Sequence, residues 1–477
     1  MFADVMTAIN NALTVVVDAL YTYILVALLV GGGLYFFIRT RALPIRMFAE
    51  SIRVVTEPPK DEGELSSFRA LMVSTASRVG VGNIAGVATA IATGGAGAVF
   101  WMWMIATLGS ATAFIESTLA QIYKKRSSRG SDSHGGPAYY ILIALKKPGL
   151  AMSFAVILIV TYMGGFNLLA SFNVAEAFTS YSWSHPTWTP VIVGGVLAIA
   201  MGASIFGGSR RLTAVTAVIV PIMAIIYVGV ALIVICINWQ NIPAMFGAIF
   251  SQAFDFQAIF GGFAGSAMML GIKRGLYSNE AGVGSAPNAA ASASVSHPVK
   301  QGLVQMMSVF IDTMIICTIT AFLILSTGVA YGDDVTGAPL VQSAMSTVFA
   351  GFAHPFVSAA LLVFAFTTLI GNFYYAEVNF RFLLRKHGQI PSWGYAIFRS
   401  VAVLLVFAGA LMEFSTVWAI GDILMGLMVL INLPVILVLG KKAIDCASDY
   451  RRQRAAGLDP HFRAADIGIT EELDFWQ

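Results

Sequence analysis

Residues 68–103 have the sequence FRALMVSTASRVGVGNIAGVATAIATGGAGAVFWMW, which is apolar enough to enter a membrane. The stretch nevertheless contains Arg78, the run Gly80-Val-Gly-Asn83 and the run Gly94-Gly-Ala-Gly97. Gly inside a helix costs roughly 1 kcal/mol relative to Ala. Arg at the bilayer centre costs at least about 2.5–3.5 kcal/mol. A helix that only spans a membrane needs neither, so the stretch predicts an interrupted membrane helix whose broken backbone has a function.

The composition supports a membrane location. Of the 477 residues 57% are hydrophobic and only 11% are charged, whereas a soluble domain has about 25% charged residues. The first apolar run is too long for a signal peptide, and no Lys or Arg precedes Arg39, so we treat it as an extra helix. A span needs about 20 apolar residues. We therefore expect an all-α polytopic membrane protein of about eleven spans, the extra helix and core helices 1 to 10, near 17–38, 68–93, 97–122, 150–180, 189–206, 212–237, 257–280, 303–331, 355–384, 393–411 and 414–440.

The basic residues alternate along the connections between these spans. Every second connection is basic: 39–69, 124–147, 210–211, 273–300, 381–399 and 441–463. The others contain no Lys or Arg: those near 94–97, 181–188, 238–256, 332–354 and 412–413. The positive-inside rule then predicts an outside N-terminus and a cytoplasmic C-terminus. In this scheme Lys273 and Arg274 flank the cytoplasmic connection between core helices 6 and 7, and an outer aromatic belt contains Trp183, Trp188, Trp239 and Trp418.

The core helices form two groups of five, at 68–238 and 257–440, between an N-terminal region of residues 1–67 and a tail of residues 441–477. An odd number of spans per group makes the groups opposite in orientation if they are a repeat. Gly-interrupted segments at matching positions of two halves indicate a transporter binding site, although Gly is also common where membrane helices pack closely. We therefore expect core helices 1 and 6 to be broken, at Gly80, Gly82 and Gly86 in the first and at Gly261, Gly262, Gly265 and Gly271 in the second.

A broken helix exposes backbone N–H groups at one half-helix and carbonyls at the other. The segment Gly80, Val81, Gly82 and Asn83 is suited to the carboxylate of a small zwitterion. The carbonyls at residues 76–79 are suited to a sodium ion, because hard cations prefer oxygen ligands. Thr367 and Thr368 in core helix 8 offer two further oxygens, a weak signal since Thr often bonds its own helix.

Acidic residues within the apolar segments mark ion paths or pair with a cation. They are Glu116, Glu176, Glu280, Asp312, Glu377 and Asp422. We expect Arg78 to pair with Glu116 or Glu280, in a structural or a gating ion pair. All six His lie in connections or the tail, so no intramembrane His is available for metal binding or acid–base catalysis, which argues against a membrane hydrolase.

Five ordered motifs resemble the alanine or glycine:cation (sodium) symporter family: Gly82-Asn-Ile-Ala-Gly-Val-Ala, Gly94-Gly-Ala-Gly-Ala-Val-Phe-Trp-Met-Trp, Gly135-Gly-Pro-Ala-Tyr-Tyr, Tyr277-Ser-Asn-Glu-Ala-Gly and His297-Pro-Val-Lys-Gln-Gly-Leu. The resemblance implies sodium-coupled import of a small neutral amino acid. It also implies a LeuT-type inverted-repeat fold of the amino acid-polyamine-organocation superfamily, with five plus five core helices and one extra N-terminal helix.

The resemblance also implies roles for individual residues. One sodium site is formed by the carbonyls of Ala76, Val79 and Phe364 and by the hydroxyls of Thr367 and Thr368. The substrate is lined by Gly80, Val81, Gly82 and Asn83, with Gly262 and Gly265 from core helix 6. The family often has Thr or Ser where this chain has Val81, and commonly a Gln in core helix 3, for which Ser171 or Asn173 substitutes here.

The sequence therefore predicts a secondary active transporter of the prokaryotic inner membrane that works by alternating access. Alanine or glycine is the expected substrate and sodium the coupling ion; we expect no cofactor, no nucleic-acid partner and a monomer in the lipid bilayer. Proton coupling through Glu116 or another buried carboxylate is the alternative within this class. An amino-acid-gated channel or sensor is the alternative outside it, although no ring of repeated charges suggests a pore.

Overall fold

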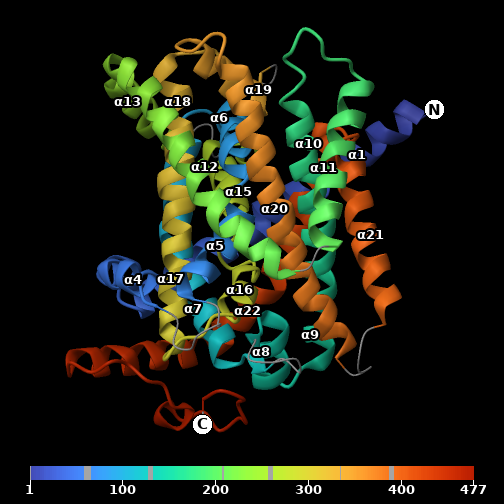
Figure 1. The fold of residues 1–477 in the computed structure, drawn as a ribbon. Coiled ribbons are helices and arrows are strands. Elements are labelled where there is room, and N and C mark those ends of the chain that lie inside the picture. The colour runs from blue at the N-terminus through green and yellow to red at the C-terminus, as the bar shows by residue number, and fades with distance from the viewer. Residues whose placement is uncertain are drawn as a thin grey trace.

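The computed structural model describes residues 2–58, 66–126, 133–206, 209–255, 262–332, 335–385 and 391–476, and almost all of them are helical (Figure 1). Within these residues nine helices are long and apolar enough to cross a membrane. They correspond to nine of the eleven expected spans. The remaining two are core helices 1 and 6, which the sequence predicted to be broken. The chain is therefore an all-helical membrane protein whose two irregular spans occupy matching positions.

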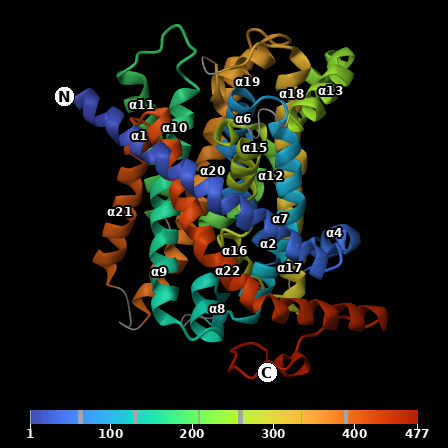
Figure 2. The same cartoon turned by 180° about the vertical axis from the view of Figure 1, so that it is seen from behind.

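The N-terminal region is one long helix followed by two short ones. The long helix packs obliquely across the bundle, with α1 against α22 and α2 against α7 (Figure 2). The elements are α1 (Phe2–Leu20), η1 (Tyr21–Leu25), α2 (Val26–Arg39), α3 (Leu43–Arg46) and α4 (Phe48–Val55).

The first group of core helices runs from α5 to α12. A two-stranded antiparallel hairpin and the short helix α8 lie between core helices 2 and 3. The elements are α5 (Ser67–Arg78), η2 (Gly82–Gly86), α6 (Val87–Gly94), α7 (Ala98–Ile122), β1 (Lys125–Arg126), β2 (Ser133–His134), α8 (Pro137–Ala144), α9 (Pro148–Ile159), η3 (Val160–Phe166), α10 (Asn167–Glu176), α11 (Trp188–Phe206) and α12 (Ser209–Ile237).

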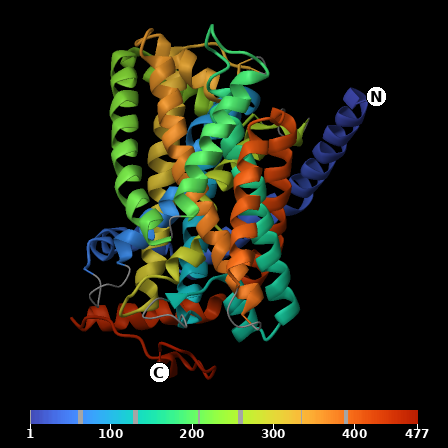
Figure 3. The same cartoon turned by 45° about the vertical axis from the view of Figure 1, so that its right-hand side comes forward.

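The second group follows a connecting segment, η4 (Trp239–Asn241) and α13 (Ile242–Ala253). Its last helix, α22, continues without interruption past residue 440, the expected start of the tail, and the chain ends beyond it at one end of the bundle (Figure 3). The elements are η5 (Phe263–Gly265), α15 (Ala267–Asn279), α16 (Ala286–Ala290), α17 (Pro298–Val309), η6 (Phe310–Cys317), α18 (Thr318–Thr327), α19 (Gly337–Ser346), α20 (Ala353–Leu384), α21 (Ser392–Gly409), α22 (Phe414–Ala455) and η7 (Ala464–Ile467).

Core helix 1 is broken where the sequence predicted. Ser66 caps the start of α5, and its hydroxyl accepts the Arg69 N–H at 3.2 Å. The helix ends at Arg78, after which Val79 is extended (φ −72°, ψ 91°). The chain resumes a helical course in the wide turn η2 and in α6. The Gly-rich run therefore separates two half-helices that lie one above the other (Figure 1).

Core helix 6 is also broken. Gly262 and Gly265 lie in an irregular stretch before α15, which begins only at Ala267, and a further break follows this helix. α15 is regular across Gly271 and ends at Asn279, where Glu280 adopts a left-handed conformation (φ 52°). Gly282 and Gly284 follow with φ of 85° and 91° before α16 begins. Figure 1 places α15 in the upper half of the bundle and α16 in the lower half. The break therefore lies at residues 280–285, which the sequence had assigned to a connection beyond the helix.

The physical reason for this error is that a glycine can serve packing as well as bending. A Cβ at Gly271 would lie 2.7 Å from the Trp101 Cβ and would collide with the Ala98 carbonyl, so Gly271 allows α15 to approach α7. Gly262 and Gly265 precede α15 and are exposed, and a Cβ added at either would meet nothing within 4 Å. Gly261 lies outside the described residues.

Lys273 and Arg274, which we expected beside a cytoplasmic connection, are buried inside α15. Lys273 Nζ lies 2.8 Å from Asp422 Oδ2, and Arg274 Nη1 lies 3.2 Å from Asp422 Oδ1. The Arg274 guanidinium also stacks over Trp418 at 3.9 Å from the ring centre. Trp418 is 3% exposed, so it is not part of an interfacial belt, whereas Trp188 is 62% exposed. Core helix 6 continues beyond its break into α16, so these residues lie within the bundle and not at the cytoplasmic end of a span.

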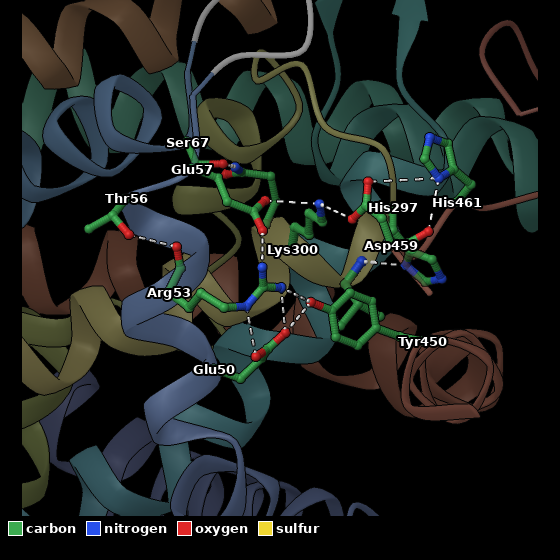
Figure 4. A network of polar contacts seen from close by, with 12 residues as sticks. Glu50, Arg53, Thr56, Glu57, Ser67, His297, Lys300, Tyr450, Asp459 and His461 are labelled. Carbon is green, nitrogen blue, oxygen red and sulfur yellow. Dashed lines mark hydrogen bonds and ion pairs between the residues drawn. The ribbon is translucent and has the colours of Figure 1, made fainter. Parts of the chain in front are cut away.

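Charged residues of distant segments meet at the end of the bundle that carries the C-terminus (Figure 4). We call Glu50, Arg53, Glu57, Lys300, Tyr450 and Asp459 the tail-end network. Arg53 Nη2 lies 2.7 Å from Glu50 and Arg53 Nη1 lies 2.6 Å from Glu57. Lys300 Nζ lies 2.9 Å from Glu57, and the Tyr450 hydroxyl donates to Glu50 at 2.6 Å. The network joins α4, the start of α17 and the end of α22.

Candidate cation and substrate sites

The end of α5 leaves backbone carbonyls without helical partners. The Val79 N–H donates to Thr75 O at 2.7 Å, which closes the last turn. The Gly80 N–H, which would continue the helix by bonding Ala76 O, donates instead to Asn83 Oδ1 at 2.9 Å. The C-terminal carbonyls of a helix carry the negative end of its dipole. The break therefore exposes oxygens that can attract a cation.

Core helix 8 brings hydroxyl oxygens to these carbonyls. The Thr368 hydroxyl donates to Ala76 O at 3.2 Å, and the Thr367 hydroxyl donates to Phe364 O at 2.9 Å. Gly80 permits the approach, since a Cβ there would collide with the Thr368 hydroxyl. The structure thus joins Ala76 to Thr368 across two helices, with Thr367 next to Thr368 and Phe364 one turn earlier on α20. Val79, the fifth predicted sodium ligand, is buried in the adjacent turn.

The predicted substrate segment lies against an aromatic wall. Gly80, Val81, Gly82 and Asn83 are all buried. A Cβ at Gly82 would lie 2.7 Å from the Tyr277 ring, so only glycine fits there. Tyr277 packs edge-on against Phe166 and Trp418, at 4.9 Å and 5.2 Å between ring centres. The wall is built from core helices 3, 6 and 10.

Asn83 joins the break to core helices 6 and 7. Its amide donates to Asp312 Oδ1 at 2.7 Å and to the Ser278 hydroxyl at 3.3 Å. The Asp312 carboxylate accepts further bonds from the Ser278 hydroxyl and, at 2.9 Å, from the Thr313 hydroxyl. Asp312, Ser278 and Thr313 are each 0% exposed. We call Asn83, Ser278, Asp312 and Thr313 the Asp312 cluster.

Sequence reasoning missed the Asp312 cluster as a unit. Asp312 was recognised only as one of several acids in apolar segments. Ser278 was placed in a connection, because the break of core helix 6 was expected earlier in the chain. The wide turn η6, which contains Asp312 and Thr313, leaves no periodic signal in the sequence, although such turns are frequent at functional sites.

A second polar chain, also missed from the sequence, connects core helices 1, 8 and 3. The Ser77 hydroxyl donates to Asn372 Oδ1 at 2.8 Å, and the Asn372 amide donates to Asn167 Oδ1 at 3.0 Å. All three helices therefore hold the break by hydrogen bonds. The Asn167 amide nitrogen at the end of this chain has no hydrogen-bond partner within the described residues, so the chain is only partly satisfied.

The predicted residues of core helix 3 do not reach the break by hydrogen bonds. The Asn173 amide donates to Leu169 O of its own helix at 2.7 Å. Within the described residues, Asn173 Oδ1 and the Ser171 hydroxyl have no hydrogen-bond partner, although both are buried. Gly262 and Gly265 are exposed and lie at the opposite end of α15 from Ser278. These four residues remain predictions that the geometry does not connect to 80–83.

Arg78 forms no ion pair with Glu116 or Glu280 within the described residues. It is 2% exposed, and Nη1 donates to Gln305 O at 3.5 Å. Glu116 accepts the Gly282 N–H at 3.3 Å and the Asn432 amide at 2.8 Å. Glu280 accepts the Ser285 hydroxyl at 2.6 Å. The expected direct pair is therefore absent, and both carboxylates have neutral donors as their hydrogen-bond partners.

A sequence model of the sodium:alanine symporter family matches residues 6–464. The amino-acid carrier protein AlsT of Bacillus subtilis (strain 168) is 42% identical over 468 residues, which cover 98% of each chain. The sodium/proton-dependent alanine carrier protein of Bacillus sp. (strain PS3) is 40% identical over 89% of this chain and 97% of its own.

A solved structure shares the fold. A single-residue mutant of the manganese transporter of Eremococcus coleocola matches with a TM-score of 0.51 over 88% of this chain and 85% of its own, at 12% sequence identity. The likeness supports a LeuT-like arrangement of helices. At this identity it carries the fold and no conclusion about the transported substrate.

Proposed function

Because the chain belongs to the sodium:alanine symporter family, we propose that it imports a small neutral amino acid, alanine or glycine, together with sodium by alternating access. The observation that carries this proposal is a contact at the break of core helix 1. There the Ala76 carbonyl, which lacks its helical partner, accepts a hydrogen bond from the Thr368 hydroxyl. Oxygen atoms of neutral groups at the negative end of a helix suit a sodium ion. A transporter of this family is not an enzyme.

The proposed sodium site holds core helix 1 against core helix 8. The carbonyls of Ala76, Val79 and Phe364 and the hydroxyls of Thr367 and Thr368 are its ligands. A cation bound between the two helices fixes the conformation of Gly80 to Asn83, whose backbone receives the substrate carboxylate. Sodium and substrate then bind better together than separately, which is the condition for coupled transport.

The aromatic wall supports a small substrate. Tyr277 already touches the backbone at Gly82, and Phe166 and Trp418 enclose its ring. A substrate whose carboxylate lies at Gly80 to Asn83 is therefore bordered by the aromatic rings of this wall. This arrangement favours alanine or glycine over larger amino acids.

The proposal includes an orientation and an architecture. Core helices 1–5 and 6–10 form two inverted repeats, since α5–α6 and α15–α16 cross the bundle in opposite directions (Figure 1). The tail-end network lies on the cytoplasmic side of an inner membrane, with the N-terminus outside, as the basic connections indicate. One chain supplies every proposed ligand, so the monomer is the transport unit.

The experiment is sodium-dependent alanine uptake into proteoliposomes by the Thr367→Ala/Thr368→Ala double variant. We expect the sodium concentration for half-maximal uptake to rise at least tenfold, about 1.4 kcal/mol. Thr107→Ala is the matched control, because its hydroxyl bonds only Trp103 O of its own helix, at 2.8 Å. An unchanged sodium dependence in the double variant contradicts the assigned site.

Proton coupling is the second candidate, and Glu116 is the observation that favours it. This carboxylate is 0% exposed and is held by the neutral donors of Gly282 and Asn432. A buried carboxylate without a cation is a natural proton carrier. Uptake driven by a pH gradient in the absence of sodium, and lost in Glu116→Gln, selects this candidate.

A further inference from the structure

A hollow lined by arginines lies at the end of the bundle that carries the C-terminus. It has a volume of about 210 Å³ and lies between the end of α2 and the last turns of α22. Arg39 and Arg41 line it from the chain that leaves α2, and Arg451 lines it from α22. Leu43 and Ile444 add apolar surface to its lining. The proposed transport function uses none of these residues.

The three arginines of the hollow have no acidic partner among the residues that the structure describes. Arg451 Nη2 lies 3.5 Å from the Ser448 hydroxyl, and Arg451 Nε is buried without a hydrogen-bond partner in the described part of the chain. Arg41 and Arg46 act on Arg451 as like charges. A guanidinium cannot lose its proton to relieve such repulsion. An anion bound in the hollow would relieve it.

The acids on the same turns of α22 are already paired with other cations. Asp445 Oδ2 lies 2.7 Å from Lys441 Nζ. Asp449 pairs with Arg452. These pairs would have to break before either acid could serve the arginines of the hollow, which favours an anion from outside the protein.

The chain turns sharply where it brings two arginines to the hollow. Thr40 ends α2, and its hydroxyl donates to Phe36 O at 2.7 Å. Arg41 and Ala42 then both adopt left-handed conformations, with φ of 57° and 54°. This conformation is unfavourable for residues other than glycine and is often retained at binding sites. The strained turn places Arg41 at the hollow together with Arg39.

Exposed apolar side chains accompany the arginines along both helices. Ile38 at the end of α2 is 63% exposed, and Val438 on α22 is 70% exposed. Both helices belong to candidate membrane spans, so these side chains can contact acyl chains. The hollow itself is smaller than the roughly 300–1,000 Å³ of pockets that enclose a whole small ligand, so it is suited to a headgroup alone. Guanidinium groups match phosphate, to which they donate two parallel hydrogen bonds.

We propose that Arg39, Arg41 and Arg451 bind the phosphate of an anionic phospholipid whose acyl chains lie along α2 and α22. Basic pockets between membrane helices are typical sites for such headgroups. The bound lipid joins the extra N-terminal helix to core helix 10. This site is separate from the proposed sodium and substrate sites, and it does not depend on the proposed function.

The affinity is measured by native mass spectrometry of the full chain in detergent, titrated with phosphatidylglycerol. We expect the wild type to bind this lipid about tenfold or more tightly than phosphatidylcholine, whose phosphate is offset by its own choline cation. Arg41→Gln/Arg451→Gln should bind phosphatidylglycerol about 30-fold more weakly, because each arginine near an anionic headgroup contributes about 1 kcal/mol. Arg41 is exposed and Arg451 is half-buried, so we expect the variant to fold.

Lys441→Gln/Arg452→Gln is the matched control, because it removes the same charge from exposed positions on α22 that do not line the hollow. It should bind phosphatidylglycerol like the wild type. An equal loss of affinity in the control overturns the site, and so does equal affinity of the wild type for the two lipids, even if the arginine variant fails to fold. Displacement of the lipid by inorganic phosphate at equal concentration would assign the hollow to a soluble anion and overturn the lipid.

Discussion

The centre of the bundle and the tail-end network both contain buried or half-buried carboxylates, but the two regions provide different kinds of partners for them. In the tail-end network Glu50 and Glu57 each lie within 3 Å of a cationic nitrogen. At the centre, Asp312 and Glu116 accept hydrogen bonds from amides, hydroxyls and backbone N–H groups, and neither forms an ion pair within the described residues. The carboxylates of the first region therefore have cationic partners within the protein, whereas these two have neutral ones.

The two regions also differ in how firmly their charge is held. The Arg53 side chain, which donates to Glu50, lowers the pKa of that carboxyl to about 2. Glu50 therefore stays charged throughout the physiological range, and its stabilising contribution is lost only as the pH falls from about 4.5 towards 2. We conclude that the tail-end network has a structural role.

The largest effect is expected when a paired carboxylate is removed from the bundle. Asp422→Asn leaves Lys273 and Arg274 buried without their shared partner, which costs about 3–5 kcal/mol. The thermal midpoint of the purified protein in detergent should fall accordingly. Lys273→Met in the same background removes one uncompensated charge and should restore some of the loss. An unchanged thermal midpoint in Asp422→Asn contradicts the claim that Asp422 compensates the charges of Lys273 and Arg274.

An intermediate effect is expected at the proposed sodium site beside Gly80. Gly80→Ala places a methyl group against the Thr368 hydroxyl and separates it from Ala76 O. Overpacking costs about 1–3 kcal/mol, which is about five- to 150-fold in sodium affinity. The sodium concentration for half-maximal alanine uptake measures this loss of affinity. Gly195→Ala is the control, because a methyl group there would meet nothing within 4 Å, and a loss of equal size in this variant refutes the explanation.

The smallest effect is expected in the tail-end network. Glu57→Gln weakens one contact of Lys300 and one of Arg53, but Lys300 keeps Asp459 as a partner at 3.4 Å and Arg53 keeps Glu50 at 2.7 Å. Exposed and half-exposed ion pairs contribute about 0–1 kcal/mol, so the thermal midpoint should shift slightly. The sodium dependence of uptake should stay as in the wild type. A changed sodium dependence would mean that the tail-end network belongs to the transport mechanism.

The sequence by itself determined the membrane class, the positions of the long spans and the break in core helix 1. These features depend on local composition, on the length of the apolar runs and on the Gly-Val-Gly-Asn run. The conformational cost of that run can be judged without knowing its tertiary contacts. The pair Thr367 and Thr368 was also found from the sequence, since two hydroxyls in an apolar helix are conspicuous.

Only the tertiary structure decided which glycines break core helix 6 and which side chains meet. Gly271 packs against α7, whereas Gly282 and Gly284 adopt positive φ, and no local signal separates the two uses. The contacts of Asp312 with Asn83 join residues more than two hundred positions apart. Such pairs depend on how the helices pack, so the charge balance at the centre became visible only when all of them were placed together.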